Sequence, residues 1–312
     1  MHTRHFPYFL FPLLLALPLA GDQLRVGVSV LPLESLVEDI GGEAVEAYSL
    51  QREGDSCSVF EPRPSVVSWI SGADLFFRTG VPYEAVVMDK LQDPSGRLKI
   101  HDLREAVELL DALNPAQAHQ HSAHGETCSA CAGVATGTDP HIWMDPRRIM
   151  EMADFMAARM GEAVPEKRAA FEAGAEALKR RAERLDGYLE DLLEPYAGEA
   201  FFMYHPALQY FADRYHLRQV AIAGGSEAPS AKELHARIRE AREKQIKVIF
   251  VQPQESRKHA GIVASAVGAT LVEVDPMAPR WERNLRLIGE TLAEGLARNT
   301  AARVASGAGA GD

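Results

Sequence analysis

Hydrophobic and polar positions along the chain predict strands and helices in alternation. Short, β-branched apolar runs with the character of buried strands occupy residues 24–30, 45–50, 74–80, 199–205, 217–223, 246–252 and 269–275. Amphipathic segments with the period of a helix occupy residues 31–42, 64–73, 207–215, 230–244, 256–267 and 280–297. This alternation is typical of α/β proteins, so we predict an α/β fold.

The pattern changes between Pro146 and Pro195, where the chain is almost wholly helical and charged residues recur at helical spacing. A helix of that length is able to cross between two lobes, and 312 residues suffice for two domains. We predict these parts: an N-terminal α/β lobe over 21–160, a linking helix over 161–195, a C-terminal α/β lobe over 196–300, and a disordered tail over 301–312.

The N-terminus has the pattern of a secretory signal peptide. Arg4 precedes an apolar run over residues 6–19, and the small residues Ala20 and Gly21 follow. Three prolines interrupt the run, and it is short for a bilayer span, so an anchoring helix is the weaker alternative. We predict that residues 1–20 are cleaved and that the mature protein is periplasmic, with no cysteine after the cleavage region for a lipid anchor.

Composition excludes some partners and permits others. The net charge is -11 and the sequence has no basic block that would follow phosphates, which argues against binding to nucleic acid. An acidic balance suits a soluble protein, which we expect to be a monomer. It also suits cation capture, although most acidic proteins bind no cation.

Residues 112–139 are small, polar and rich in histidine, without apolar periodicity, and we predict a loop there. Imidazoles and thiolates are good zinc ligands, so the segment is a candidate auxiliary metal-collecting arm. The alternatives are a solvated linker and a local disulfide formed in an oxidising compartment. The candidate ligands of this loop are His119, His121, His124, Cys128 and Cys131.

Three further candidate metal ligands lie at the edges of predicted strands or helices. His141 opens the helical region in GTDPHIWMDP, His205 follows a strand in FFMYHPALQYF, and Asp275 ends a strand in ATLVEVDPM. Such positions are where α/β sheets present binding residues, and two imidazoles with one carboxylate suit a borderline cation. Either histidine alone is equally compatible with a structural role, and an aspartate such as Asp275 is more often only a turn former. The spacing of the three residues does not prove that they converge.

Eight motifs follow one another along the chain: VGVSVLPLESLVEDIGG, FEPRPS, ADLFFRTG, TDPHIWMDP, YHPALQYFADRYHL, EAPSAKEL, FVQPQ and VEVDPM. In these motifs and in their order, nearly the whole mature chain resembles the zinc and manganese substrate-binding proteins of bacterial ABC importers. The resemblance implies two α/β lobes joined by one long, rather rigid helix, with the ion in the cleft between the lobes. It also implies that His141, His205 and Asp275 are the second, third and fourth ligands.

The first ligand of the resembled family is a histidine, and this chain has Ser58 at that position, next to Cys57. Three interpretations remain open: Cys57 or Ser58 substitutes, a loop histidine completes the shell, or water does. A Cys57 thiolate would favour Zn²⁺ over Mn²⁺, which prefers oxygen-rich shells. Without a metal role, Cys57 would be a small buried or unpaired thiol.

The resemblance predicts a non-enzymatic protein that captures a divalent metal, most simply Zn²⁺, and delivers it to an ABC permease of the inner membrane. Mn²⁺ or another transition metal is a less favoured cargo, and a periplasmic metallochaperone is a further candidate partner. Two alternatives are an exported zinc-dependent hydrolase and a metal-handling or adhesion protein without a transport partner. The sequence lacks an H-E-x-x-H helix to supply the general base of a metallohydrolase.

Overall fold

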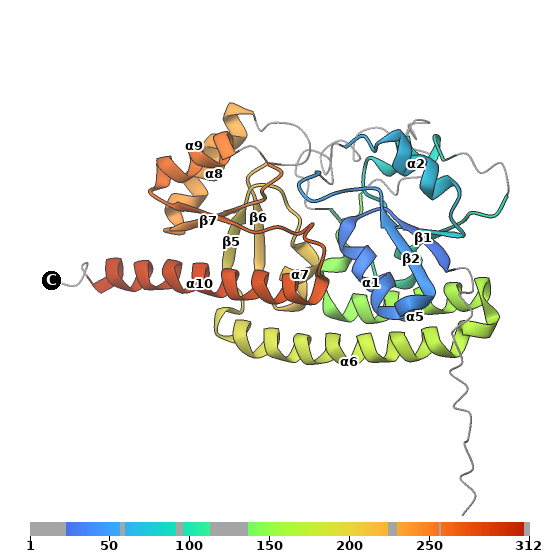
Figure 1. The fold of residues 1–312 in the computed structure, drawn as a ribbon. Helices are drawn as coiled ribbons and strands as arrows, with labels where there is room; N and C mark the ends of the chain where they lie inside the picture. Colours follow the sequence, from blue (N-terminus) through green and yellow to red (C-terminus); the bar gives the residue numbers. More distant parts are fainter. Residues whose placement is uncertain are drawn as a thin grey trace, which may run out of the picture.

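The computed structural model of the chain describes residues 23–56, 60–91, 96–112, 137–223, 230–255 and 257–308. These residues form two four-stranded parallel sheets, each with its own helices, above a layer of long helices (Figure 1). The predicted α/β fold with two lobes is therefore correct. The predicted signal peptide, residues 1–20, lies outside the described residues.

The N-terminal sheet has the strand order β2-β1-β3-β4, and all its neighbouring strands are parallel. The two inner strands, β1 and β3, are each buried at all but one position, as expected of parallel strands covered on both faces. The fourth strand escaped prediction because it lies at the edge and exposes both Lys99 and Ile100. The strand bounds are β1 Leu24–Val28, β2 Val45–Ser49, β3 Leu75–Arg78 and β4 Lys99–Asp102.

Proline begins several helices of the N-terminal lobe. Pro32 lies in the first turn of α1 (Leu31–Gly41), and Pro64 begins α2 (Pro64–Ser71). Proline fits there because the first backbone N–H groups of a helix have no partner within the helix. The short helix α3 (Glu84–Met88) follows β3.

The long helical region consists of two helices that pack against each other, α5 (Pro146–Ala163) and α6 (Arg168–Leu193). A single 3₁₀ turn that begins at Pro165 separates them, because proline cannot continue the backbone ladder of α5. The helix that corresponds to the predicted linker is therefore α6, which begins seven positions later than the predicted boundary at residue 161.

Helix α6 contacts both lobes at close range. A Cβ atom added to Gly174 would lie 2.1 Å from the carbonyl oxygen of Ile40, so the first half of α6 runs against α1 of the N-terminal lobe. A Cβ atom added to Gly289 would lie 2.3 Å from Leu189, so the last turns of α6 run against α10. Glycine permits each approach, and α6 thus packs against both lobes.

The C-terminal sheet has the order β6-β5-β7-β8 and is also wholly parallel. Its strands are β5 Ala200–Met203, β6 Arg218–Ala221, β7 Val248–Val251 and β8 Thr270–Glu273. Its helices are α7 Gln209–Arg214, α8 Ala231–Glu243, α9 Arg257–Val267 and α10 Trp281–Ala308. None of the helices in the described ranges is long and apolar enough to cross a membrane.

The last helix corrects one expectation about the tail. Residues 301–308 were predicted to be disordered, but they continue α10 to Ala308. The segment is rich in alanine, the best helix former, and extends a helix that is already nucleated. Only residues 309–312 of the predicted tail lie outside the described residues.

Two hydrophobic clusters divide the C-terminal sheet by face. Phe201 and Met203 of β5 belong to a large core that continues through α6 and α10 into the N-terminal lobe. Phe202 and Tyr204 point to the other face and belong to a smaller cluster under α8 and α9. One face of the second sheet is therefore part of the same core as the first lobe.

Candidate metal centre

His141 lies at the start of a 3₁₀ turn, Ile142–Met144, just before α5. Its Nδ1 atom is 2.6 Å from Oδ1 of Asp139, and the same oxygen accepts the His141 backbone N–H at 2.8 Å. Both residues are buried, with 4% and 2% of their surface exposed. An ionised Asp139 requires the proton on Nδ1, which leaves Nε2 with the lone pair that a metal needs.

Asp139 is itself fixed from the C-terminal lobe. The hydroxyl group of Tyr210 in α7 donates to the Asp139 carbonyl oxygen at 2.9 Å and accepts the Leu110 backbone N–H at 3.1 Å. Burial raises the pKa of Tyr210 to about 12, so this hydroxyl stays protonated and keeps its donor. Residues 137–139, assigned to the loop by sequence, thus belong to the ordered fold because Asp139 binds His141 and Tyr210.

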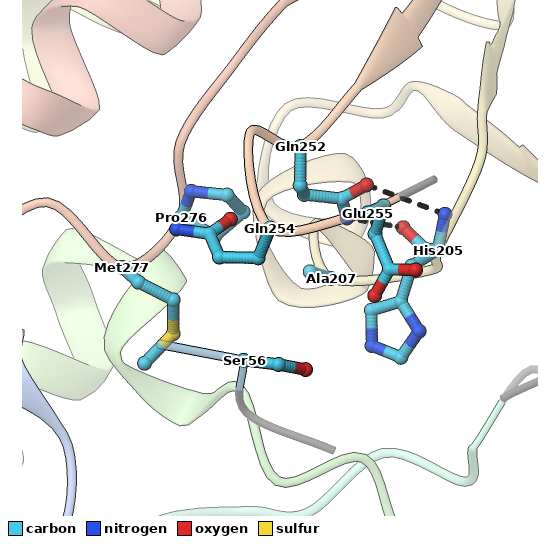
Figure 2. A pocket seen from close by; sticks show the side chains of 8 residues that line it. All are labelled: Ser56, His205, Ala207, Gln252, Gln254, Glu255, Pro276 and Met277. Carbon is cyan, nitrogen blue, oxygen red and sulfur yellow. Dashed lines mark hydrogen bonds between the residues drawn. The ribbon is translucent and has the colours of Figure 1, made fainter. Parts of the chain in front are cut away.

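His205 follows β5, at the carboxyl edge of the C-terminal sheet, and is also buried. The Gln252 side chain, which follows β7, binds both backbone groups of His205. Its Nε2 donates to the His205 carbonyl oxygen at 2.7 Å, and its Oε1 accepts the His205 N–H at 3.4 Å (Figure 2). The backbone of His205 is therefore held by a neighbouring strand end.

The two histidine rings meet edge to face, with their centroids 5.6 Å apart and an angle of 74° between their planes. Two imidazoles that share one tetrahedral zinc ion, with Zn–N distances of about 2.0–2.1 Å, have centroids roughly 5 Å apart. His141 comes from the segment that leads into α5 and His205 from the C-terminal sheet. The structure thus brings two of the three predicted ligands together, at a separation that one ion could span.

Asp275 follows β8 at the same edge of the C-terminal sheet and is half-buried. Its Oδ1 accepts hydrogen bonds from Nε2 of Gln254 at 2.8 Å and from the Met277 N–H at 2.9 Å. The next residue, Pro276, accepts a hydrogen bond at 2.9 Å from the indole of Trp143, two positions after His141. The Asp275 loop is therefore tied directly to the His141 segment.

The Asp275 carboxylate does not join the imidazole pair in this structure. Among the residues described here, no three side chains of His, Cys, Asp or Glu are grouped closely enough to hold an ion. The hydrogen bonds to Oδ1 orient the carboxylate and leave Oδ2 for a ligand role. Ion capture would therefore have to draw a carboxylate toward the two imidazoles.

A small cavity of about 10 Å³ lies beside His205, with room for a single water-sized or ion-sized guest. Ser56 and Met277 lie on one side of it and His205 on the other (Figure 2). The full lining is Ser56, His205, Ala207, Gln252, Gln254, Glu255, Pro276 and Met277. Ser56 belongs to the N-terminal lobe, so the cavity lies between the lobes.

Sequence reasoning missed four residues of this centre: Asp139, Gln252, Gln254 and Glu255. The last three follow β7 in FVQPQES, and the carboxyl end of a parallel strand is where such a sheet presents binding residues. Their position directly after a predicted strand could therefore have marked Gln252, Gln254 and Glu255 as candidate site residues. For Asp139, the corresponding feature was its place two residues before His141.

The other predicted ligands lie outside the described residues. These are Cys57 and Ser58 near the expected first ligand, and His119, His121, His124, Cys128 and Cys131 of the loop. Ser56 is the described residue adjacent to the first group, and it lines the cavity beside His205. The roles of these seven residues remain predictions.

Residues 26–300 match the family model described as zinc-uptake complex component A, periplasmic, or ZnuA. The chain belongs to the ZnuA family. This membership agrees with the resemblance found in the motifs, and the family is one of solute-binding proteins, not of enzymes. Family members are components of uptake complexes outside the cytoplasm.

Known proteins are similar to this chain in sequence and in fold. The zinc-binding lipoprotein AdcA of Streptococcus pneumoniae is 24% identical over 269 residues, which cover 86% of this chain and 52% of AdcA. The chain thus spans about half the length of that curated relative. A crystal structure of ZnuA is 27% identical, with a TM-score of 0.77 over 88% of this chain and 100% of that one.

A manganese-bound periplasmic metal-binding protein from Candidatus Liberibacter asiaticus has the same fold. It is 17% identical, with a TM-score of 0.73 over 88% of this chain and 100% of that protein. The fold is therefore found in proteins that bind zinc and in a protein that binds manganese.

Proposed function

We propose that this protein captures a divalent transition metal outside the cytoplasm, with Zn²⁺ as the preferred ion, and delivers it to an ABC-type importer. The observation that carries the proposal is the edge-to-face contact of two buried imidazoles, His141 and His205, contributed by different parts of the fold. Membership of the ZnuA family supports the uptake role.

In this proposal His141 and His205 each give one nitrogen, and Asp275 gives a carboxylate oxygen. The hydrogen bond from His141 to Asp139 supports the assignment, because a carboxylate on the second ring nitrogen orients a ligating imidazole and makes it more basic. The hydrogen bonds that Oδ1 of Asp275 accepts orient that carboxylate. Two nitrogens and an oxygen form a set that zinc accepts readily.

Zinc is preferred over Mn²⁺ on ligand chemistry. Imidazole nitrogens suit zinc, whereas manganese is best served by shells dominated by oxygen. The histidine-rich loop favours zinc for the same reason, and we propose that it collects the ion as an auxiliary arm. The signal peptide over residues 1–20, a periplasmic location, the inner-membrane permease and a metallochaperone donor belong to the same proposal.

Two experiments on residues outside the described ranges distinguish which group fills the remaining coordination position. If Cys57 replaces the histidine absent at Ser58, then Cys57→Ser alone will weaken the tightest site. If a loop histidine completes the shell, only deletion of residues 118–131 will do so. Both are measured by competitive Zn²⁺ titration of metal-stripped protein without residues 1–20.

The test of the proposed function is the same titration on the single variants His141→Ala and His205→Ala. Each removes one ligand and leaves a cavity in the cleft, so we expect the tightest zinc site to weaken by at least about 100-fold, the upper end of effects seen for residues that only support ligands. His235→Ala is the matched control, because His235 is exposed on α8. Unchanged zinc binding in both cleft variants would contradict the proposal.

A further inference from the structure

Glu255 lies in the turn after β7 and is connected through hydrogen bonds to the backbone of His205. Its N–H donates to the carbonyl oxygen of Gln252 at 3.1 Å, and the Gln252 side chain binds the N–H and the carbonyl oxygen of His205. The β7 turn and the His205 segment thus form one bonded unit. This fixes where the Glu255 side chain starts relative to the imidazole.

The Glu255 carboxylate and the His205 imidazole line the same small cavity. Figure 2 shows the two side chains next to each other, both extending toward the side where Ser56 lies. Among the eight described residues around this cavity, Glu255 has the one carboxylate and none is lysine or arginine. The residues that line the cavity therefore place a carboxylate and an imidazole within reach of a bound ion.

The carboxylate of Glu255 is only partly exposed to solvent and lies next to other side chains of the C-terminal lobe. Glu255 is half-buried. Its carboxylate lines the cavity beside the His205 imidazole, so it lies close to the strand end that carries this ring.

We propose that the Glu255 carboxylate is a ligand of the captured ion, beside His205 in the cavity between the lobes. This inference rests on the proposed function, since it concerns the same ion. A glutamate side chain turns about three bonds and can move its oxygens into the cavity from a fixed backbone. Glu255 would then supply the donor that Ser58, in place of a histidine, does not.

A Glu255 ligand would change the relative affinity of the site for Zn²⁺ and Mn²⁺. Two neutral imidazoles with Asp275 and Glu255 form a shell whose two negative charges neutralise a dication. A fourth ligand with oxygen instead of nitrogen makes the shell harder and brings the affinities for Mn²⁺ and Zn²⁺ closer together. Replacing Glu255 by histidine should therefore separate the two affinities.

The experiment uses the metal-stripped mature chain and competitive titration with Zn²⁺ and with Mn²⁺. We expect Glu255→Gln, which keeps the shape and removes the charge of a ligand, to weaken binding of both ions by at least about 100-fold, the upper end of the effect for residues that only support ligands. Glu255→His should keep tight zinc binding and weaken manganese binding. Glu243→Gln is the matched control, because Glu243 is an exposed glutamate on α8.

A crystal structure of the zinc-loaded chain gives the second readout. The proposal predicts a Glu255 oxygen about 2.0–2.2 Å from the ion, the usual distance for a carboxylate ligand. Wild-type affinities in Glu255→Gln, or a zinc ion without Glu255 in its shell, would overturn this assignment. If His205→Ala still loses zinc binding in that case, the proposed function stands; if His205→Ala binds normally, the function itself has failed.

Discussion

The two candidate histidines are held in different ways. His141 is fixed through its ring, because Asp139 binds Nδ1 and the Trp143 ring packs edge-on at 5.3 Å between centroids. His205 is fixed through its backbone, by the amide of Gln252. The first imidazole is therefore set in its tautomer and orientation before an ion arrives. For the second imidazole, these hydrogen bonds fix the backbone from which the ring extends.

Helix α6 supports both sides of this comparison. The Asp186 carboxylate accepts hydrogen bonds from Arg147, six positions after His141, at 3.0 Å and from Arg214 of α7 at 2.7 Å. Tyr215 adds a third donor at 3.1 Å. A single buried side chain of α6 thus connects the segments that carry the two histidines.

The largest expected effect comes from breaking this shared support. Asp186→Asn removes the buried charged partner of Arg214 and leaves it the exposed Glu190 carboxylate at 3.0 Å. We therefore expect the free energy of unfolding to fall by about 3 kcal/mol, the lower end for a broken buried pair. Urea unfolding at neutral pH measures it. Asp154→Asn, at an exposed aspartate that pairs with Lys179, is the control and should cost less than about 1 kcal/mol.

The pH dependence of that effect provides an independent check. Burial alone would raise the pKa of Asp186, but the hydrogen bonds and charges of Arg214 and Arg147 outweigh it and lower the pKa below 3.8. The stabilisation is therefore present at neutral pH and is lost as the pH falls through this lowered value. The difference between wild type and Asp186→Asn should shrink below about pH 4; a constant difference would show that the charge is not its cause.

Next in size is the loss of ring orientation at His141. Asp139→Asn removes the charge that holds the proton on Nδ1, and we expect zinc affinity to fall by about 10- to 100-fold. Competitive titration measures this loss. The same Asp154→Asn variant is the control for affinity. An unchanged affinity in Asp139→Asn would mean that the ring of His141 needs no carboxylate partner.

The smallest effect on zinc affinity is expected at Gln252, which supports the backbone of His205. Gln252→Ala removes both bonds to the His205 backbone but no bond to its ring, so zinc affinity should fall by about tenfold or less, the lower end for supporting residues. Stability should fall by about 1–3 kcal/mol, because buried backbone groups lose their partners. A larger loss of affinity than in Asp139→Asn would reverse the comparison between the two histidines.

The sequence predicted the fold well where burial dictated pattern. The apolar runs of β5 and β7 are buried at every position, and each was predicted as a strand. The edge strand β4 was missed because its half-exposed sequence KIHD has no apolar run. The last turns of α10 were missed because small residues suggested disorder, although alanine favours continuation of a helix.

The site was predictable only in part. His141, His205 and Asp275 lie at strand or helix edges, where pattern and family motifs both point to them. Asp139 and Gln252 act through contacts set by turn geometry and by pairs far apart in sequence, which no local pattern contains. The identity of the remaining ligand stays a prediction for Cys57, Ser58 and the loop residues, and a proposal for Glu255.

The most direct test of the account is zinc K-edge X-ray absorption of the chain without residues 1–20, loaded with one equivalent of Zn²⁺, beside the same chain with His141→Ala or His205→Ala. The account predicts two imidazole nitrogens at about 2.0–2.1 Å in the wild type and one fewer in each variant. A wild-type shell made only of sulfur and oxygen, or an imidazole count that neither substitution changes, would contradict it.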